Sequence, residues 1–266
     1  MSAIKAWLDG RAADERRDVE VMISFLTGRS RAALYAHGEE RLPPAVERRL
    51  EHLLERRRAG EPIAYLIGRR EFFGLDLQVT PAVLVPRPET ELVVELALER
   101  LPQRARVLDL GTGSGAIAIA IAKARPDCLV SASDVDVAAL DVAERNAVHH
   151  GARIEFRASD WFEAWHATRF DAIVGNPPYV ADDDPHFAGL GFEPRIALAA
   201  GPRGLDALAA IVRDASAHLE HGASLILEHG AEQGEAVRAL FAAAHLRDVA
   251  THRDLAGCER VTLGTR

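Results

Sequence analysis

The sequence predicts an α/β fold, a doubly wound sheet of seven strands whose last pair is antiparallel, with a small all-helical domain before it. From residue 106 onward, short apolar runs alternate with segments of helical length, which is typical of a parallel sheet covered by helices on both faces. The last two predicted strands lie too close in sequence for a helical crossover, so we expect an antiparallel hairpin there. Residues 1–70 carry helical periodicity.

We expect three parts: a helical domain at residues 1–70, a β-hairpin and proline-rich connector at 71–88, and a larger domain at 89–266. In the first part, helical periodicity covers residues 16–26 and a second segment opened by Pro43-Pro44. We interpret the arginine run at 56–58 as a solvated helix end rather than a nucleic-acid patch. The hairpin turns at Gly74, and Thr90 or Glu89 is the expected cap of the next helix.

The larger domain supplies the strands and helices of the expected sheet. The predicted strands are 106–110, 129–134, 153–157, 170–175, 223–228, 247–251 and 260–263. The predicted helices between them are 115–123, 138–149, 204–219 and 233–244. The two kinds of segment therefore follow one another as in a doubly wound fold.

The composition indicates an ordinary globular protein with an acidic balance. Of 266 residues, 48% are hydrophobic and 27% charged, and the net charge is −8, which argues against duplex nucleic acid as the main partner. No stretch approaches a membrane span, and charge follows the first residues, so we expect a cytoplasmic protein that does not contact membranes. Cys128 and Cys258 form neither a disulfide framework nor a metal site, and we expect both to be small core residues.

A glycine-rich turn follows the first strand of the alternating region. Its glycines have the spacing G-x-G-x-G, whereas a dinucleotide loop has G-x-G-x-x-G. Glycines let the backbone approach a ligand closely, and the helix after them offers free N–H groups. Asp134 ends the second strand, where a carboxylate accepts both hydroxyls of a ribose. The turn consists of Gly111, Thr112, Gly113, Ser114 and Gly115.

Trp161 follows the third strand of this region, between Asp160 and Phe162. In a nucleotide site, an aromatic ring at this place lies against an adenine. Plain core packing explains the same tryptophan equally well, so both interpretations stay open.

The stretch Asn176-Pro177-Pro178-Tyr179, here called the acceptor turn, follows the fourth strand. Neither proline can donate a ladder hydrogen bond, so the strand ends there and the turn is stiff. The side-chain oxygen of Asn176, the proline carbonyls and the face of Tyr179 suit a planar group that carries an NH2. The alternative is an ordinary surface turn; the glycine loop and Asp134 upstream favour a binding site.

Together these segments resemble class I S-adenosylmethionine-dependent N-methyltransferases. Further stretches are similar to the bacterial release-factor glutamine methyltransferases, and the similarity runs from about residue 18 to residue 261. Val180 stands where that family usually has isoleucine, and Ala207-Leu208 replaces a site that is often aromatic; we see no chemical consequence. The stretches are 61–68, Glu71-Phe72, 86–91, Glu193-Pro194-Arg195, and Glu228-His229-Gly230 with Gln233.

The resemblance implies transfer of a methyl group from S-adenosylmethionine to the glutamine of the Gly-Gly-Gln motif in peptide chain release factors. Residues 111–115 and Asn176 would contact the cofactor, with Asp134 on its ribose and Trp161 against its adenine. Asn176 and Pro177 would hold the hydrogens of the substrate amide, and Tyr179 would stack on its plane, next to Pro178. No metal is implied. The N-terminal helices would grip the release factor, and we expect a monomer.

Three alternative functions remain at this point. An adenine-N6 methyltransferase would use the same acceptor turn on a flipped base, although the acidic balance argues against nucleic acid. A ribosomal-protein glutamine methyltransferase would differ mainly in its N-terminal region. A cofactor-binding scaffold without catalysis would have no use for Asn176.

Three other groups of polar residues invite a functional interpretation. Glu193 and Arg195 either position the substrate or form a structural salt bridge. The run Asp182-Asp183-Asp184 is better explained by a solvated loop than by a metal cluster. For His229 we expect a satisfied core hydrogen bond rather than a role as a base.

Overall fold

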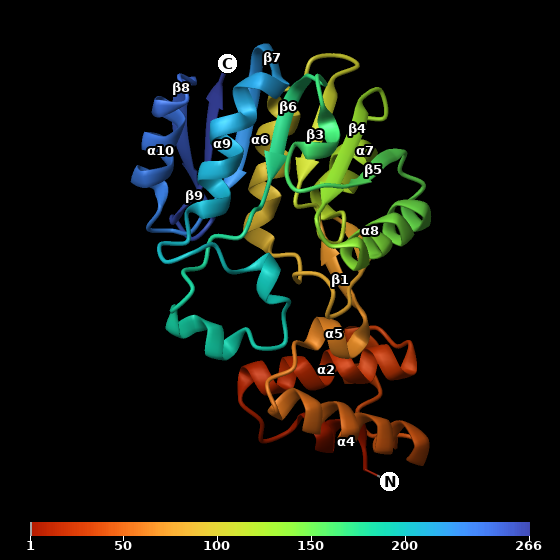
Figure 1. Ribbon diagram of the computed structural model, residues 1–266. Helices are drawn as coiled ribbons and strands as arrows, with labels where there is room; N and C mark the ends of the chain where they lie inside the picture. The colour runs from red at the N-terminus through yellow and green to blue at the C-terminus, as the bar shows by residue number, and fades with distance from the viewer. Residues whose placement is uncertain (1) are drawn as a thin grey trace. The chain divides into compact units, whose positions relative to one another are not determined.

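The computed structural model describes residues 2–266 of the chain, which divides into two compact units, Met1–Gly68 and Arg69–Arg266 (Figure 1). The first unit is helical, and the second contains the sheet. Among the described residues, no helix is both long and apolar enough to cross a membrane.

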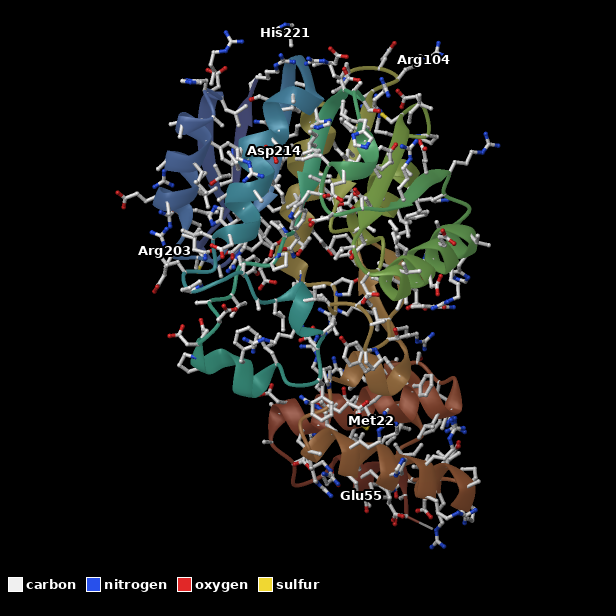
Figure 2. All side chains as sticks on the ribbon, in the orientation of Figure 1. Met22, Glu55, Arg104, Arg203, Asp214 and His221 are labelled. Carbon is white, nitrogen blue, oxygen red and sulfur yellow. The ribbon has the colours of Figure 1, made fainter. Side chains whose placement is uncertain are left out.

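The first unit packs its helices around one apolar cluster. Its two long helices, α2 (Ala13–Thr27) and α4 (Pro44–Arg58), confirm the predicted periodicity, and Pro44 occupies the first turn of α4. Met22 of α2 is fully buried, whereas Glu55 of α4 is exposed (Figure 2). The shorter helices are α1 (Ile4–Leu8), α3 (Arg31–Ala36) and α5 (Ile63–Ile67).

The arginine run at the end of α4 is neutralised within the first unit. Arg57 Nε donates to Asp18 Oδ2 at 2.6 Å, and Arg56 Nε donates to Glu61 Oε2 at 2.7 Å. All three arginines, including the exposed Arg58, lie in the last turn, where cations complement the helix dipole. This agrees with the interpretation of a solvated helix end.

In the described part of the second unit, seven strands form one sheet in the order β5-β4-β3-β6-β7-β9-β8. The pairs are parallel from β5 to β7, and β9 runs antiparallel to both β7 and β8. The antiparallel pairing of the last two strands confirms the prediction. The strands are β3 (Arg106–Leu110), β4 (Leu129–Asp134), β5 (Ile154–Ala158), β6 (Phe170–Gly175), β7 (Leu219–Glu228), β8 (Arg247–Arg253) and β9 (Glu259–Thr265).

Helices cover the two faces of this sheet because the strand residues alternate between them. In β6, Val174 joins the cluster under α6 (Glu91–Arg100) and α7 (Ala116–Ala124), on the same face as α8 (Val137–His150). Its neighbour Ile173 joins the opposite cluster under α9 (Asp206–His218) and α10 (Gly234–Ala243). The predicted hairpin at Gly74 is formed by β1 (Arg69–Phe72) and β2 (Leu75–Gln78).

Two local predictions are wrong. Thr90 occupies the position before α6, but its side chain makes no capping hydrogen bond, and Glu89 lies inside the short 3₁₀ helix Pro88–Thr90. Cys258 is exposed because it lies in the turn between β8 and β9 rather than in a strand. Cys128 is half-buried beside β4, and the pKa of its thiol is raised by burial.

Candidate active site

The candidate site lies at the carboxyl ends of β3, β4 and β6, which are adjacent parallel strands. The glycine loop follows β3, Asp134 ends β4, and the acceptor turn follows β6. In the sheet, β4 and β5 lie on one side of β3, and β6 and β7 lie on its other side, so the strand order reverses direction at β3. Such a switch point is where open α/β sheets bind ligands. The sheet thus brings together three segments that the sequence predicted as parts of one site.

The loop after β3 needs glycine because its backbone is left-handed. Gly111, Gly113 and Gly115 have φ values of 67°, 55° and 82°. A Cβ on Gly115 would lie 3.0 Å from Ile119 Cδ1 and 3.2 Å from Ala143 Cβ, so α7 and α8 approach each other through this position. The G-x-G-x-G spacing therefore serves both the turn and the packing of the helices.

Asp134 holds this loop while it lines the cavity. Its Oδ2 accepts from Gly113 N at 2.9 Å, and its Oδ1 accepts from Asp136 N at 3.0 Å. Burial raises the pKa of Asp134, and these backbone donors offset part of that effect. Each carboxylate oxygen has two lone pairs, so both can still accept a hydrogen bond from a ligand hydroxyl.

Asp109, at the end of β3, is a fully buried carboxylate behind the loop. Its Oδ2 accepts from Thr112 Oγ1 at 2.6 Å and from Ala118 N at 3.2 Å, while its Oδ1 makes no hydrogen bond. Burial raises the pKa of Asp109 to about 7, and the donors Thr112 and Ala118 oppose the rise. Asp109 thereby ties the loop to the first turn of α7.

Trp161 both lines the cavity and packs against the core. It lines the cavity, and a Cβ on Gly111 would lie 3.6 Å from its Cζ3. The side chain is half-buried and also packs against the core cluster on the α9 side of the sheet. Its φ of 42° is unusual for a large residue, so the backbone holds the ring in place at some cost.

The acceptor turn presents only part of itself to the cavity. Asn176 and Pro178 line it, whereas Pro177 is buried and Tyr179 is not among the lining residues. Asn176 Nδ2 donates to Thr90 Oγ1 at 3.1 Å, which leaves Oδ1 as the atom available to a ligand. Tyr179 donates through its hydroxyl to Glu228 Oε1 at 3.0 Å.

The backbone after the turn is also tied down. Gln233 Nε2 donates to the Tyr179 carbonyl at 3.0 Å, and Gln233 Oε1 accepts from Gly230 N at 2.8 Å. Val180 then forms a parallel bridge with Ala199. These contacts link the acceptor turn to the segment that closes the cavity.

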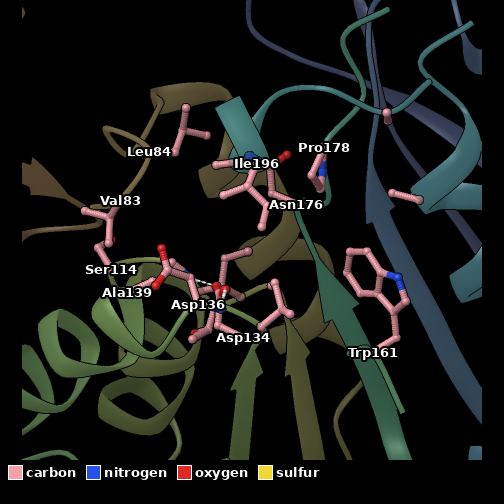
Figure 3. A pocket seen from close by; sticks show the side chains of 18 of the residues that line it. Val83, Leu84, Ser114, Asp134, Asp136, Ala139, Trp161, Asn176, Pro178 and Ile196 are labelled. Carbon is pink, nitrogen blue, oxygen red and sulfur yellow. Dashed lines mark hydrogen bonds between the residues drawn. The ribbon is translucent and has the colours of Figure 1, made fainter. Parts of the chain in front are cut away.

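The cavity has a volume of about 540 Å³, a size suited to a cofactor rather than a single small group. In Figure 3, Asp134 and Asp136 lie on one side, Trp161 on the other, and Asn176 with Pro178 above them. The sequence did not single out several lining residues, although the proline spacing at 81–88 marked a stiff segment here. These are Ala82, Val83, Leu84, Val135, Asp136, Ala139, Ile196, Ala197, Ala199, Ala200, Gly201 and Asp206.

Glu193 forms the structural salt bridge that was one of its two interpretations. Its carboxylate pairs with Arg87 and accepts from Val85 N at 3.0 Å, so it joins the loop after the acceptor turn to the proline-rich connector. Arg195 lies over the Phe187 ring, with its Cζ 4.7 Å from the ring centroid. Since both joined segments line the cavity, this ion pair helps to form its wall.

His229 makes the core hydrogen bonds that were expected. It is fully buried, with Nδ1 2.8 Å from the Gly230 carbonyl and Nε2 2.9 Å from Thr262 Oγ1. Burial lowers its pKa, so the ring is neutral at physiological pH. Among residues 2–266, which the structure describes, no cluster of three or more His, Cys, Asp or Glu side chains could hold a metal ion, and this includes the run 182–184.

Comparisons with known proteins match both units. The family described as PrmC N-terminal domain matches residues 5–68, and that described as Methyltransferase small domain matches residues 89–189.

Release factor glutamine methyltransferase of Salmonella typhimurium is 49% identical over 94% of this chain and 91% of its own length. The enzyme of that name from Bordetella pertussis is 50% identical over 94% of each chain. A methyltransferase structure from Pyrococcus furiosus shares the fold, with a TM-score of 0.56 and 20% identity over 81% of this chain and 96% of that chain. This chain belongs to the release factor glutamine methyltransferase family.

Proposed function

We propose that the protein transfers a methyl group from S-adenosylmethionine to the side-chain amide nitrogen of the glutamine in the Gly-Gly-Gln motif of peptide chain release factors. The observation that carries this proposal is the orientation of Asn176. Because its NH2 group donates to Thr90, its carbonyl oxygen is left to accept an N–H from an amide. This oxygen belongs to a residue that lines the same cavity as the glycine loop and Asp134.

The residues of the cavity fit S-adenosylmethionine. The left-handed glycines allow close backbone approach, Asp134 lines the cavity with lone pairs for ribose hydroxyls, and Trp161 offers a ring for adenine. Two half-buried side chains that line the cavity, Asp134 and Asp136, give it an acidic lining that suits a cationic ligand. When bound, the cofactor supplies an electrophilic methyl group on a sulfonium.

The chain's own contribution to the reaction is orientation. An amide nitrogen is a poor nucleophile because its lone pair is delocalised into the carbonyl. Asn176 Oδ1 and the Pro177 carbonyl would accept its two hydrogens and so aim the nitrogen at the methyl group, while Tyr179 would support the amide plane. The nitrogen loses its proton readily after transfer, so the reaction requires no strong base.

The family also suggests the partner and its location. A release factor is a protein substrate, and the helical first unit, which carries the family's N-terminal domain, would bind it. Modification of a translation factor would take place in the cytoplasm. We propose that the protein acts there as a monomer.

Methyl transfer to three candidate acceptors tests the proposal. The protein is incubated with S-adenosylmethionine and a release factor, a ribosomal protein or adenine-containing DNA, and mass spectrometry locates the added methyl. One methyl on the Gly-Gly-Gln glutamine is expected, with none on a release factor whose glutamine is replaced by alanine. A methyl on adenine or on the ribosomal protein instead would overturn the proposed substrate.

A further inference from the structure

The side chain of Gln233 joins the acceptor turn to the frame of the sheet. Its Nε2 donates to the Tyr179 carbonyl at 3.0 Å and to the Gly204 carbonyl at 3.1 Å, and its Oε1 accepts from Gly230 N at 2.8 Å. All of these partners are backbone atoms, and a backbone carbonyl can only accept while a backbone N–H can only donate. The orientation of the Gln233 amide is therefore fixed by its surroundings and does not depend on the protonation state of any group.

The place where these groups meet admits no larger side chain. Gly204 has a φ of 66°, and a Cβ there would overlap the Tyr179 carbonyl oxygen and lie 2.9 Å from Gln233 Nε2. The acceptor turn and the loop before α9 thus approach each other backbone to backbone. Two carbonyl oxygens cannot bond to each other, so Gln233 supplies the donor that both of them need.

The acceptor turn has a further backbone tie, but that one leads to a loop rather than to the sheet. Val180 N donates to the Leu198 carbonyl at 2.8 Å, and Ala200 N donates to the Val180 carbonyl at 2.9 Å. These bonds fasten the turn to another part of the same long loop between β6 and α9. Gln233 is itself held by the helix, because Val237 N of α10 donates to its carbonyl at 2.9 Å. Its side chain therefore anchors the loop to the rigid part of the unit.

A stiff turn is aimed by the position of its ends. Pro177 and Pro178 have fixed φ values, and each restricts the residue before it, so the turn moves nearly as one body. Its first end continues β6, and its far end is the Tyr179 carbonyl, two residues after the carbonyl of Pro177. The contact of the Tyr179 hydroxyl with Glu228 holds the ring but leaves the backbone carbonyl to Gln233. Release of that end would change the direction of the Pro177 carbonyl.

We propose that Gln233 is a positioning residue that keeps the acceptor turn aimed at the substrate amide. Among the described residues, Gln233 is not one that lines the cavity, so it acts through the Tyr179 carbonyl rather than on the substrate itself. Misaimed acceptors affect the reaction step more than binding, because small displacements of reacting groups cost rate. This inference rests on the proposed function for the identity of the substrate, whereas the tie itself is a property of the protein alone.

The kinetic test replaces Gln233 by methionine, which has nearly the same length and no donor. In Gln233→Met we expect kcat for release-factor methylation to fall by about 10- to 100-fold. The KM for the release factor and the Kd for S-adenosylmethionine should stay within about twofold of wild type, because the glycine loop and Asp134 are untouched and a large protein substrate binds through many other contacts. The matched control is Arg169→Met, which should keep wild-type kinetics. Arg169 Nη1 donates to the Leu219 carbonyl at 2.8 Å, at the opposite ends of β6 and β7.

A second variant reaches the same contact from the other side. In Gly204→Ala the new Cβ displaces the Tyr179 carbonyl while Gln233 stays intact, so the same fall in kcat is expected. The double variant with Gln233→Met should be no slower than the slower single variant, because both changes break one tie. The proposal would be overturned by additive losses, by a wild-type kcat in either single variant, or by an equal loss in Arg169→Met. A KM or a cofactor Kd that rises as much as kcat falls would indicate a general structural role and would overturn it too.

Hydrogen exchange without substrate separates this inference from the proposed function. The amides of Val180 and Ala200 are hydrogen-bonded, so we expect them to exchange slowly in the wild type, as followed by mass spectrometry of peptide fragments. We expect faster exchange at both in Gln233→Met but not in the control variant. The reference is Ile119, whose N–H donates to the Gly115 carbonyl at 2.8 Å and should exchange equally in all variants. Exchange at Val180 that is unaffected in Gln233→Met would refute the positioning role even in an active enzyme. Absence of methyl transfer by the wild type would refute the proposed function alone.

Discussion

Replacement of Asp109 by asparagine tests the electrostatics of the site in a quantity that needs no substrate. An asparagine side chain places its oxygen where Oδ2 accepts from Thr112 and Ala118, and its NH2 where Oδ1 has no partner. The variant therefore has the shape of the protonated carboxylic acid at every pH. The difference in unfolding free energy between wild type and variant isolates the ionisation of this one group.

The sign and size follow from the raised pKa of Asp109. Between pH 3.8 and about 7 the folded protein keeps a proton that the unfolded chain has released, so the wild type loses stability as pH rises. The loss is about 1.4 kcal/mol per pH unit, which amounts to about 3 kcal/mol between pH 5 and pH 8, with most of it complete by pH 7. Asp109→Asn is therefore expected to become the more stable protein, relative to wild type, as pH rises.

The assay is urea unfolding at pH 5, 6, 7 and 8, followed by tryptophan fluorescence. A Trp7→Phe background is used for both proteins, because the remaining tryptophans, Trp161 and Trp165, belong to the unit that contains Asp109. Groups far from Asp109 titrate equally in both proteins and cancel in the difference, which leaves Asp109 and its Coulomb coupling to Asp134. A stability difference that stays constant across this pH range would refute the reasoning.

Three further substitutions test the site and its sheet. Asn176→Ala removes the acceptor oxygen and is expected to lower turnover by about 100-fold or more, with a smaller loss of cofactor affinity. Near-normal turnover would exclude its role. Asp134→Ala is expected to weaken cofactor binding by about 10-fold or more, because charged hydrogen bonds are lost. Unchanged affinity by calorimetry would contradict a ribose contact. In Gly175→Ala, the new Cβ would lie 2.8 Å from the Leu110 carbonyl oxygen, so β3 and β6 must separate. We expect a loss of about 2 kcal/mol in unfolding experiments; a Tm equal to that of the wild type would show that the strands adapt freely.

The strand pattern was predictable because it depends on local alternation. In β3, β4 and β6 the structure begins and ends each strand at the predicted residues, since each is an apolar run bounded by a glycine or an acidic residue. β7 begins earlier than expected, at Leu219, because its first residues pair with Phe170 across a register shift. A bulge of this kind leaves no sign in the periodicity.

The sequence by itself determined the order of strands and helices, the glycine loop, the carboxylate of Asp134 and the stiffness of the acceptor turn. Each of these depends on residues close together in the chain. Only the tertiary structure decided which atom of Asn176 faces the cavity, because Thr90 precedes it by 86 residues. Glu228 likewise reaches Tyr179 across 49 residues, from the end of the neighbouring strand. The parallel sheet brings these distant strand ends together, and the hydrogen bonds between them then fix the orientation of the site.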